Sequence, residues 1–242
     1  GLSAILVTGG EPLLREDFAD IYMMFKRKGL LVSVFTNATT IRDEHIALFK
    51  NYPPRDIEVT IYGASRESYE RVTRRPGSFA AFTRGLDALF DAGMRVRLKA
   101  MAIRSNFDDM ESMAAFGIAR TKDYYRFDPQ LHLRYDGNPV RNEEIKGERL
   151  TPDEVVALER ADKERFGALQ ESCDTFTNPE FTHINCNHLF HCGAGNGGFS
   201  VGYDGTFRLC SSLWAPGTTM NLRETSLREA WETLVPYVRD LR

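Results

Sequence analysis

The sequence predicts an α/β fold in which parallel strands alternate with helices, followed by a small extension that contains a β-hairpin. Short apolar runs bounded by glycine, proline or polar residues alternate with helical patterns over the first 128 residues. This order is typical of parallel βα units with right-handed crossovers. The alternation stops after about residue 170, where a hairpin pattern follows. Five βα units are fewer than the eight of a closed barrel, so a partial barrel and an open sheet both fit.

Apolar periodicity and start signals define the elements of the first part. The run Ala4-Ile5-Leu6-Val7 reads as a strand because it is apolar and ends at two glycines. Ser65 is a candidate helix cap, and Gly77-Ser78 opens a further helix. The other predicted strands cover 30–37, 56–62, 95–103 and 124–128, and the other predicted helices cover 16–29, 42–50 and 107–119, with the helix after Gly77 ending near 92.

The second part of the chain differs in character. Residues 129–150 are polar and carry several glycines and prolines, and Thr151-Pro152 then supplies a cap and a first-position proline for a new helix. Asp204-Gly205 separates the runs 199–203 and 206–209, which is a hairpin signature. Residues 226–231 have the pattern of a short amphipathic helix. We expect one domain over residues 1–150 and a second over 151–242.

Composition narrows the class of protein. The chain has 242 residues, 42% of them hydrophobic, which is enough for a sizeable core. Its net charge of −3 gives no reason to expect nucleic acid or an anionic membrane as a partner. No apolar run approaches the ~20 residues of a membrane span, and no secretory signal precedes the first strand, so we expect a cytoplasmic protein. The four cysteines are too few for a disulfide scaffold of this size, and all lie in the second half.

The loop after the first strand is the first candidate site. Gly9 and Gly10 let the backbone approach a ligand, and Glu11 adds a carboxylate at the carboxyl end of a strand. Such a loop suits a ligand that carries a cationic amine. A tight turn with a solvated glutamate is the alternative.

Polar residues at or near the ends of the other strands extend this candidate site. Thr36, Asn37, Thr60 and Lys99 would meet at one edge if the sheet is parallel. Asn37 could instead be a turn residue, and Lys99 could be solvated on an outer face. A lysine on an inward face would need a partner.

The cysteines form a second candidate site. Cys192 and Cys210 flank the predicted hairpin, so both thiols could converge on one iron–sulfur cluster, with Cys186 as a third ligand. Cys173 fits a buried apolar residue better. Zinc is the competing interpretation, because cysteine and histidine suit tetrahedral Zn²⁺. Its ligands would come from His183, Cys186, His188, His191 and Cys192, although the spacing matches no common finger and these histidines could be loop residues.

Several motifs in order resemble a radical S-adenosylmethionine enzyme with a C-terminal SPASM or twitch extension. Thr8-Gly9-Gly10-Glu11-Pro12 matches the GGEP motif of that family, and Thr36-Asn37-Ala38 resembles its next strand end. The spacing Cys192, Gly205, Cys210 fits the first half of the SPASM cysteine pattern. The similarity extends over nearly the whole chain, through 61–79, 127–137 and 226–231. It implies a partial (β/α)6-type barrel and a small auxiliary-cluster domain.

The sequence also departs from that family. The CxxxCxxC segment that binds the catalytic [4Fe–4S] cluster is not in the sequence and would lie upstream of Gly1, and the remaining SPASM cysteines would follow Arg242. We therefore expect an internal fragment, or a chain whose ends were lost or left unresolved, that is inactive alone.

The resemblance implies an activity, cofactors and partners. A reduced cluster would cleave S-adenosylmethionine to a 5′-deoxyadenosyl radical that abstracts hydrogen from a substrate. The first choice of substrate is a ribosomally made peptide, with flavodoxin or ferredoxin as reductant. Glu11 with Gly9 and Gly10 would hold the methionine ammonium, and Thr36, Asn37, Thr60 and Lys99 would contact ribose or carboxylate. Cys192 and Cys210 would ligate an auxiliary cluster. A sulfatase-maturase-type enzyme, a small-molecule radical enzyme and a non-enzymatic zinc module are the alternatives.

Overall fold

The computed structural model describes residues 2–123, 125–134, 136–177, 187–190 and 192–242. The chain divides into two compact units, and each is described here by itself. The first unit consists of Gly1–Leu131 and Val140–Thr151, and the second of His132–Pro139 and Pro152–Arg242.

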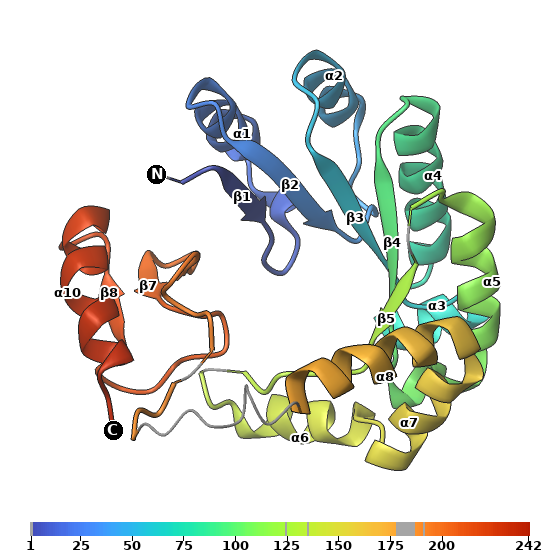
Figure 1. The fold of residues 1–242 in the computed structure, drawn as a ribbon. Coiled ribbons are helices and arrows are strands. Elements are labelled where there is room, and N and C mark those ends of the chain that lie inside the picture. Colours follow the sequence, from blue (N-terminus) through green and yellow to red (C-terminus); the bar gives the residue numbers. More distant parts are fainter. Residues whose placement is uncertain (1, 124, 135, 178–186, 191) are drawn as a thin grey trace. The chain divides into compact units, whose positions relative to one another are not determined.

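A five-stranded parallel sheet forms the centre of the first unit (Figure 1). Its spatial order follows the chain order: β1 (Ala4–Val7), β2 (Leu31–Thr36), β3 (Asp56–Ile61), β4 (Val96–Met101) and β5 (Arg126–Asp128). Every neighbouring pair is parallel, which confirms the prediction of five βα units. Because all strands run the same way, their carboxyl ends lie along one edge of the sheet.

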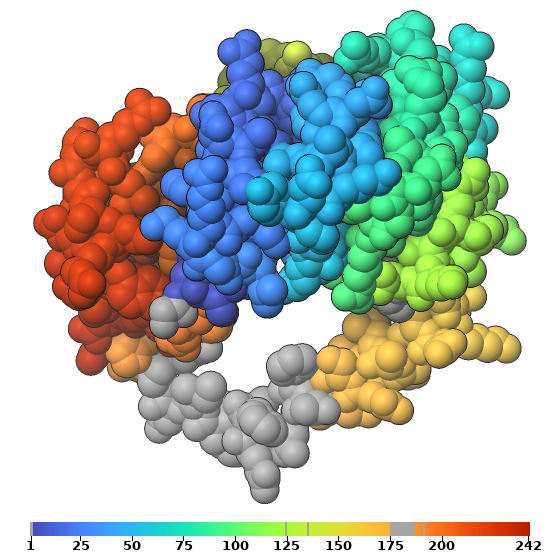
Figure 2. Space-filling view, turned by 90° about the horizontal axis from the view of Figure 1, so that it is seen from above, coloured from blue at the N-terminus to red at the C-terminus, as the bar shows by residue number. Residues whose placement is uncertain are grey.

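Helices connect the strands at the positions that the sequence predicts. They are α1 (Phe18–Arg27), α2 (Asp43–Asn51), α3 (Arg66–Thr73), α4 (Ser78–Asp91) and α5 (Met110–Arg120), with 3₁₀ turns η1 (Pro12–Leu14) and η2 (Arg104–Asp109). Seen from above, α1, α2, α4 and α5 lie side by side in chain order (Figure 2). Ser65 caps α3 as expected, because its side chain accepts a hydrogen bond from the backbone N–H of Ser68.

The two faces of the sheet differ in chemistry. Ile57, Val59 and Ile61 of β3 are fully buried, as are Phe82 and other apolar side chains of α4, so this face packs against the helices. The opposite face carries charged side chains that pair with one another: Glu58, Lys99, Arg126 and Asp128. An apolar core therefore holds the helices on one side, while the other side is polar.

Three helices follow the sheet. The polar stretch 129–150, predicted from its glycines and prolines as a break in the βα pattern, contains α6 (Pro139–Glu148). None of the α6 residues is buried, so the apolar stripe that would have indicated a helix is missing, and Pro139 at its first position was the available signal. The helix predicted after Thr151 is α7 (Pro152–Ala161), and α8 (Lys163–Thr177) follows it.

The rest of the second unit has its own small core. The predicted hairpin is confirmed: β6 (Ser200–Val201) pairs antiparallel with β7 (Thr206–Arg208). A third strand, β8 (Thr219–Asn221), joins β7 and was not predicted because it is short and polar. The helix predicted over 226–231 extends further, as α10 (Leu227–Arg239). Their buried side chains form one cluster: Phe207, Leu209, Ala230, Leu234, Val235 and Val238.

Within the described part of the chain, no helix has the length and apolar character needed to cross a membrane.

Candidate functional site at the carboxyl edge of the sheet

The loop after β1 presents open backbone. Gly9 has a φ of +140°, a conformation that side-chain-bearing residues rarely adopt, so the loop requires glycine there. A Cβ atom added at Gly9 or Gly10 would meet no atom within 4 Å. The two glycines therefore leave room for a ligand against the backbone at the end of β1.

Glu11 is fixed in place by three hydrogen bonds. Its Oε1 accepts from the Leu13 backbone N–H at 3.1 Å and from the Thr36 hydroxyl at 2.8 Å, and its Oε2 accepts from the Asn37 N–H at 2.7 Å. These bonds tie the β1 loop to the end of β2. A carboxylate can accept about four hydrogen bonds, so Oε2 keeps capacity for one more donor. The residue as a whole is half-buried.

Thr36 and Asn37 support Glu11 in different ways. Thr36 is 4% exposed, and its hydroxyl donates to Glu11 while accepting the Ala38 N–H at 3.0 Å. Because the single hydroxyl proton is used by Glu11, Thr36 acts through that carboxylate. The Asn37 side chain accepts the Thr39 N–H at 2.9 Å, which is the turn role that its sequence position allowed.

Thr60 and Lys99 lie side by side on neighbouring strands. They are register partners in the β3–β4 pair. The Lys99 ammonium lies 3.8 Å from Glu58 and 3.8 Å from Asp128, and its side chain is 13% exposed. Glu58 also accepts a hydrogen bond from Arg126 at 2.9 Å. Lys99 is largely buried, and its ammonium group is paired with the carboxylates of Glu58 and Asp128. These two carboxylates compete with any ligand for the positive charge of Lys99.

Tyr62 and Tyr69 lie in the segment 61–79, which resembles the family, and neither was among the site residues predicted from the sequence. Burial raises the pKa of Tyr62, and the charge of Glu11 raises it further. Burial likewise raises the pKa of Tyr69, with smaller contributions from Tyr62 and Glu11. Both phenols therefore hold their protons more tightly than an exposed tyrosine does.

The second unit positions the loop after Cys192. Arg239 of α10 donates from Nη1 to the backbone oxygens of Cys192 at 2.5 Å and Ala194 at 2.9 Å. Gly195 has a φ of +76°, and a Cβ atom there would come within 2.9 Å of the Leu209 side chain. Since Leu209 precedes Cys210, the Cys192 loop and the Cys210 segment pack against each other.

Cys210 itself accepts a backbone hydrogen bond. The Ser212 N–H donates to its Sγ at 3.4 Å. Cys210 is half-buried, and Cys192 is exposed. Cys173, which the sequence suggested was a buried apolar residue, is exposed instead, because α8 buries no face at that point.

The remaining metal candidates give no complete ligand set. Cys186, His183 and His191 lie outside the described residues. The ring of His188 lies 3.2 Å from an Asp240 carboxylate oxygen. Among the residues that the structure describes, no three histidine, cysteine or acidic side chains are grouped to hold a metal ion.

The protein is of the α/β class, and its parallel sheet carries an open glycine loop and a hydrogen-bonded carboxylate at the carboxyl edge, where α/β proteins commonly bind their ligands. Residues 1–117, just under half of the chain, match the model of the Radical SAM superfamily. Its members use S-adenosylmethionine and a [4Fe–4S] cluster.

Curated relatives are small-molecule enzymes by name. GTP 3′,8-cyclase of Rhodopirellula baltica is 30% identical over 125 residues, which are 50% of this chain and 34% of that protein. Fe-coproporphyrin III synthase of Methanosarcina barkeri is 27% identical over 97% of this chain and 62% of its own length.

A solved structure shares the fold. SuiB of Streptococcus suis superposes over 99% of this chain and 58% of its own length, with a TM-score of 0.72 and 14% identity. SuiB structures have also been solved with S-adenosylmethionine and with the precursor peptide SuiA. The partial radical SAM barrel expected from the sequence is thereby confirmed. The chain spans about a third to three fifths of the length of these relatives.

The residues present fit one of the two family cofactors. The open glycines and the free capacity of Glu11 Oε2 suit the ammonium group of S-adenosylmethionine. The cysteines at 173, 186, 192 and 210 do not have the CxxxCxxC spacing, so these 242 residues offer no ligand set for the catalytic cluster.

Proposed function

We propose that the protein acts as a radical S-adenosylmethionine enzyme whose Glu11 loop holds the cofactor. When bound, S-adenosylmethionine supplies the 5′-deoxyadenosyl radical that removes a hydrogen atom from the substrate. The observation that carries this proposal is the Glu11 carboxylate, held by three donors from two loops beside open glycine backbone. A carboxylate fixed in this way can bind an ammonium group without losing side-chain entropy on binding.

Four of the site residues and the glycine backbone then have the following roles. Glu11 Oε2 accepts a hydrogen bond from the methionine ammonium, and the backbone of Gly9 and Gly10 lies against the same group. Asn37 and Thr60 contact the ribose or the carboxylate. Lys99, held between Glu58 and Asp128, contributes positive potential on the inner face of the sheet.

For the substrate we propose a ribosomally made peptide, modified by hydrogen abstraction. The support is the fold shared with SuiB, whose structure has been solved with the precursor peptide SuiA. Flavodoxin or ferredoxin would supply the electron. A small-molecule substrate is the second candidate, and the observation in its favour is the 97% of this chain that aligns with Fe-coproporphyrin III synthase.

We assign Cys192 and Cys210 to an auxiliary [4Fe–4S] cluster of SPASM or twitch type, with Cys186 as a third ligand. The support is the packing of Gly195 on Leu209, which brings the two cysteine segments together, and the amide donor at Cys210.

The test is 5′-deoxyadenosine formation by the whole protein after anaerobic reconstitution, with S-adenosylmethionine and dithionite. We expect 5′-deoxyadenosine to form, and the 242-residue chain, which contains no CxxxCxxC, serves as the inactive reference. Candidate peptides and porphyrins labelled with deuterium distinguish the substrates, since only the true one transfers deuterium to 5′-deoxyadenosine. An iron-loaded whole protein that forms no 5′-deoxyadenosine would refute the proposal.

A further inference from the structure

Asn106 of η2 is a fully buried polar side chain at the carboxyl ends of β3 and β4. Its Nδ2 donates to the Tyr62 carbonyl oxygen at 2.9 Å and to the Met101 carbonyl oxygen at 2.9 Å. Its Oδ1 accepts the Ile103 N–H at 3.0 Å. Both amide protons are therefore used within the protein, and the side chain has no exposed surface with which to touch a ligand.

The two carbonyl groups held by Asn106 follow the last register pair of β3 and β4. That pair is Ile61 and Ala100, so Tyr62 and Met101 are the next residues along the two strands. Two carbonyl oxygens cannot hydrogen-bond to each other, and one amide group supplies a donor to each of them. This pair of bonds, the Asn106 clip, therefore holds the two strands together where they reach the carboxyl edge of the sheet.

The loop that follows β3 is also held on both sides. From η2, the Asp109 carboxylate accepts the Ala64 N–H at 2.7 Å. On the side of α3, a Cβ atom added at Gly63 would come within 2.3 Å of the Tyr69 backbone nitrogen, so the loop packs directly on the helix backbone. The end of β3 is thus fixed by η2 and by α3 together.

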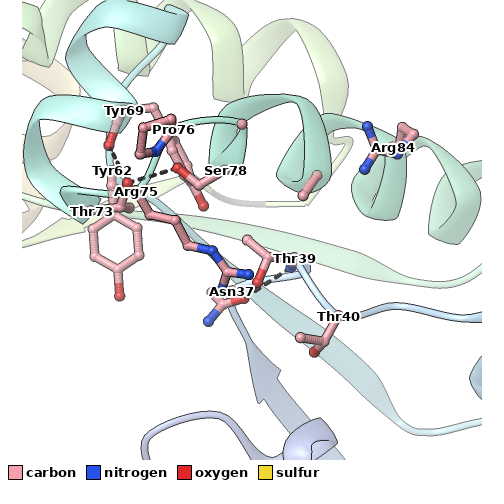
Figure 3. A pocket seen from close by; sticks show the side chains of 12 residues that line it. Asn37, Thr39, Thr40, Tyr62, Tyr69, Thr73, Arg75, Pro76, Ser78 and Arg84 are labelled. Carbon is pink, nitrogen blue, oxygen red and sulfur yellow. Dashed lines mark hydrogen bonds between the residues drawn. The ribbon is translucent and has the colours of Figure 1, made fainter.

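Tyr62, whose carbonyl the clip holds, faces the candidate cofactor site. Tyr62 and Asn37 line the same pocket, and Figure 3 shows both among its side chains. The Asn37 N–H donates to Glu11, so this pocket adjoins the Glu11 site. The ring of Tyr62 packs edge-on against Tyr69, with 5.8 Å between the ring centroids. The backbone of Tyr62 is therefore held by Asn106 and its ring by Tyr69.

The clip lies two residues beyond Thr60 on β3 and two residues beyond Lys99 on β4. We propose that Asn106 is a positioning residue for S-adenosylmethionine, because it fixes the strand ends on which Thr60 and Lys99 lie. The inference rests on the proposed function of the Glu11 site. Buried Asn106 touches no ligand and acts through the two strands, as a supporting hydrogen bond behind a binding site does.

The test is the variant Asn106→Asp in the reconstituted whole protein. The replacement has nearly the same shape and keeps an acceptor for the Ile103 N–H, but it removes both donors of the clip. We expect the affinity for S-adenosylmethionine, measured by equilibrium binding, to fall about three- to tenfold, and the urea midpoint of unfolding to fall as well. If the carboxylate prevents folding, Asn106→Ala removes the same donors without adding a charge.

Thr121→Val is the matched control, because Thr121 makes the same kind of bond at the opposite end of β4. Its hydroxyl donates to the Val96 carbonyl oxygen at 2.7 Å. We expect this variant to lower the urea midpoint while the affinity for S-adenosylmethionine stays within about twofold of the wild type. Wild-type affinity in the Asn106 variant would overturn the proposal. An equal loss of affinity in Thr121→Val would show that Asn106 only stabilises the fold.

Hydrogen exchange of the amides at 63–65 separates this inference from the proposed function, because it needs no ligand. We expect faster exchange there in Asn106→Asp and wild-type exchange in Thr121→Val. A wild type that binds no S-adenosylmethionine would refute the proposed function and, with it, the ligand named here. Unchanged exchange in Asn106→Asp would refute the clip itself, whatever the wild type binds.

Discussion

The Glu11 loop of the first unit and the Cys192 loop of the second unit are both candidate cofactor sites, and they are built differently. Glu11 is oriented by donors from Leu13, Thr36 and Asn37, and the strand ends behind it belong to a five-stranded sheet. The Cys192 loop is held by backbone contacts from Arg239 and by Gly195 packed on Leu209, on a core of six buried side chains.

The Glu11 site is organised before its ligand binds, whereas we expect the Cys192 site to be completed by its ligand. In the first unit the Glu11 carboxylate is already oriented by its hydrogen bonds, so little side-chain ordering is needed when a ligand binds. In the second unit Cys192 is exposed, and a small core alone contributes limited stability. A cluster bound there would add binding free energy to folding free energy, as structural metals do. We therefore expect changes at the Glu11 site to affect affinity, and changes at the Cys192 loop to affect stability.

The largest expected effect is that of Glu11→Gln. The variant keeps the side-chain volume but loses the charge that binds an ammonium group, so the affinity for S-adenosylmethionine should fall about 10- to 100-fold. Equilibrium binding to the reconstituted whole protein measures it. Glu16→Gln, an exposed glutamate just before α1, is the control and should retain wild-type affinity. Equal affinities of wild type and Glu11→Gln would remove Glu11 from the cofactor site.

The next effect concerns Gly195→Ala. A Cβ there would lie 2.9 Å from Leu209 and would force a side chain into a φ of +76°, so the free energy of unfolding of the second unit should fall by about 1–3 kcal/mol. Urea unfolding measures the change. Gly193→Ala, where a Cβ meets no atom within 4 Å, should cost less than about 1 kcal/mol. If both variants were equally stable, the Cys192 loop would not pack as described.

Thr36→Val should have a smaller effect on the affinity for S-adenosylmethionine than Glu11→Gln. It removes one of three donors that orient Glu11, so we expect a loss of about three- to tenfold, with Thr36→Ser restoring most of the affinity. Failure of the serine variant to rescue would show that the hydroxyl does not position the carboxylate.

The smallest effect is a pH dependence at His45. Burial and the charge of Arg42 lower the pKa of this histidine below its ordinary value of 6.5. Because the folded-state pKa is the lower one, its stabilising contribution is complete above about pH 6.5 and is lost as pH falls through the folded-state value. His45→Gln, whose amide oxygen can still accept the Arg42 N–H, should flatten the fall in stability between pH 7 and 5. An unchanged slope would contradict this assignment.

The sequence predicted the sheet well because buried parallel strands leave a strong local signal. In β2, Val32 and Val34 lie on either side of a polar residue, and in β3 Ile57, Val59 and Ile61 alternate with polar residues, which is the period of a strand. Ser65 and Pro152 mark helix starts with their own backbone chemistry. Elements without an apolar stripe, α6 and β8, left no such signal. Their stability comes from contacts distant in the sequence, which a local pattern does not contain.

The sequence predicted where the candidate site lies but not the hydrogen bonds and ion pairs within it. That Glu11, Thr36 and Asn37 share an edge follows from parallel strands. The hydrogen bond that the Thr36 hydroxyl donates to Glu11, 25 residues away in the sequence, depends on strand register and loop geometry. The partners of Lys99 also lie on other strands, at Glu58 and Asp128.

The most direct test of the account is iron, sulfide and zinc per chain after anaerobic reconstitution of the whole protein, compared with its Cys192→Ala/Cys210→Ala variant. The exposed Cys173 provides the control variant, Cys173→Ala. We predict iron and sulfide in equal amounts in the wild type and in Cys173→Ala, and about four fewer of each in the double variant. Zinc without iron in all three would contradict the radical enzyme and support a zinc-binding module.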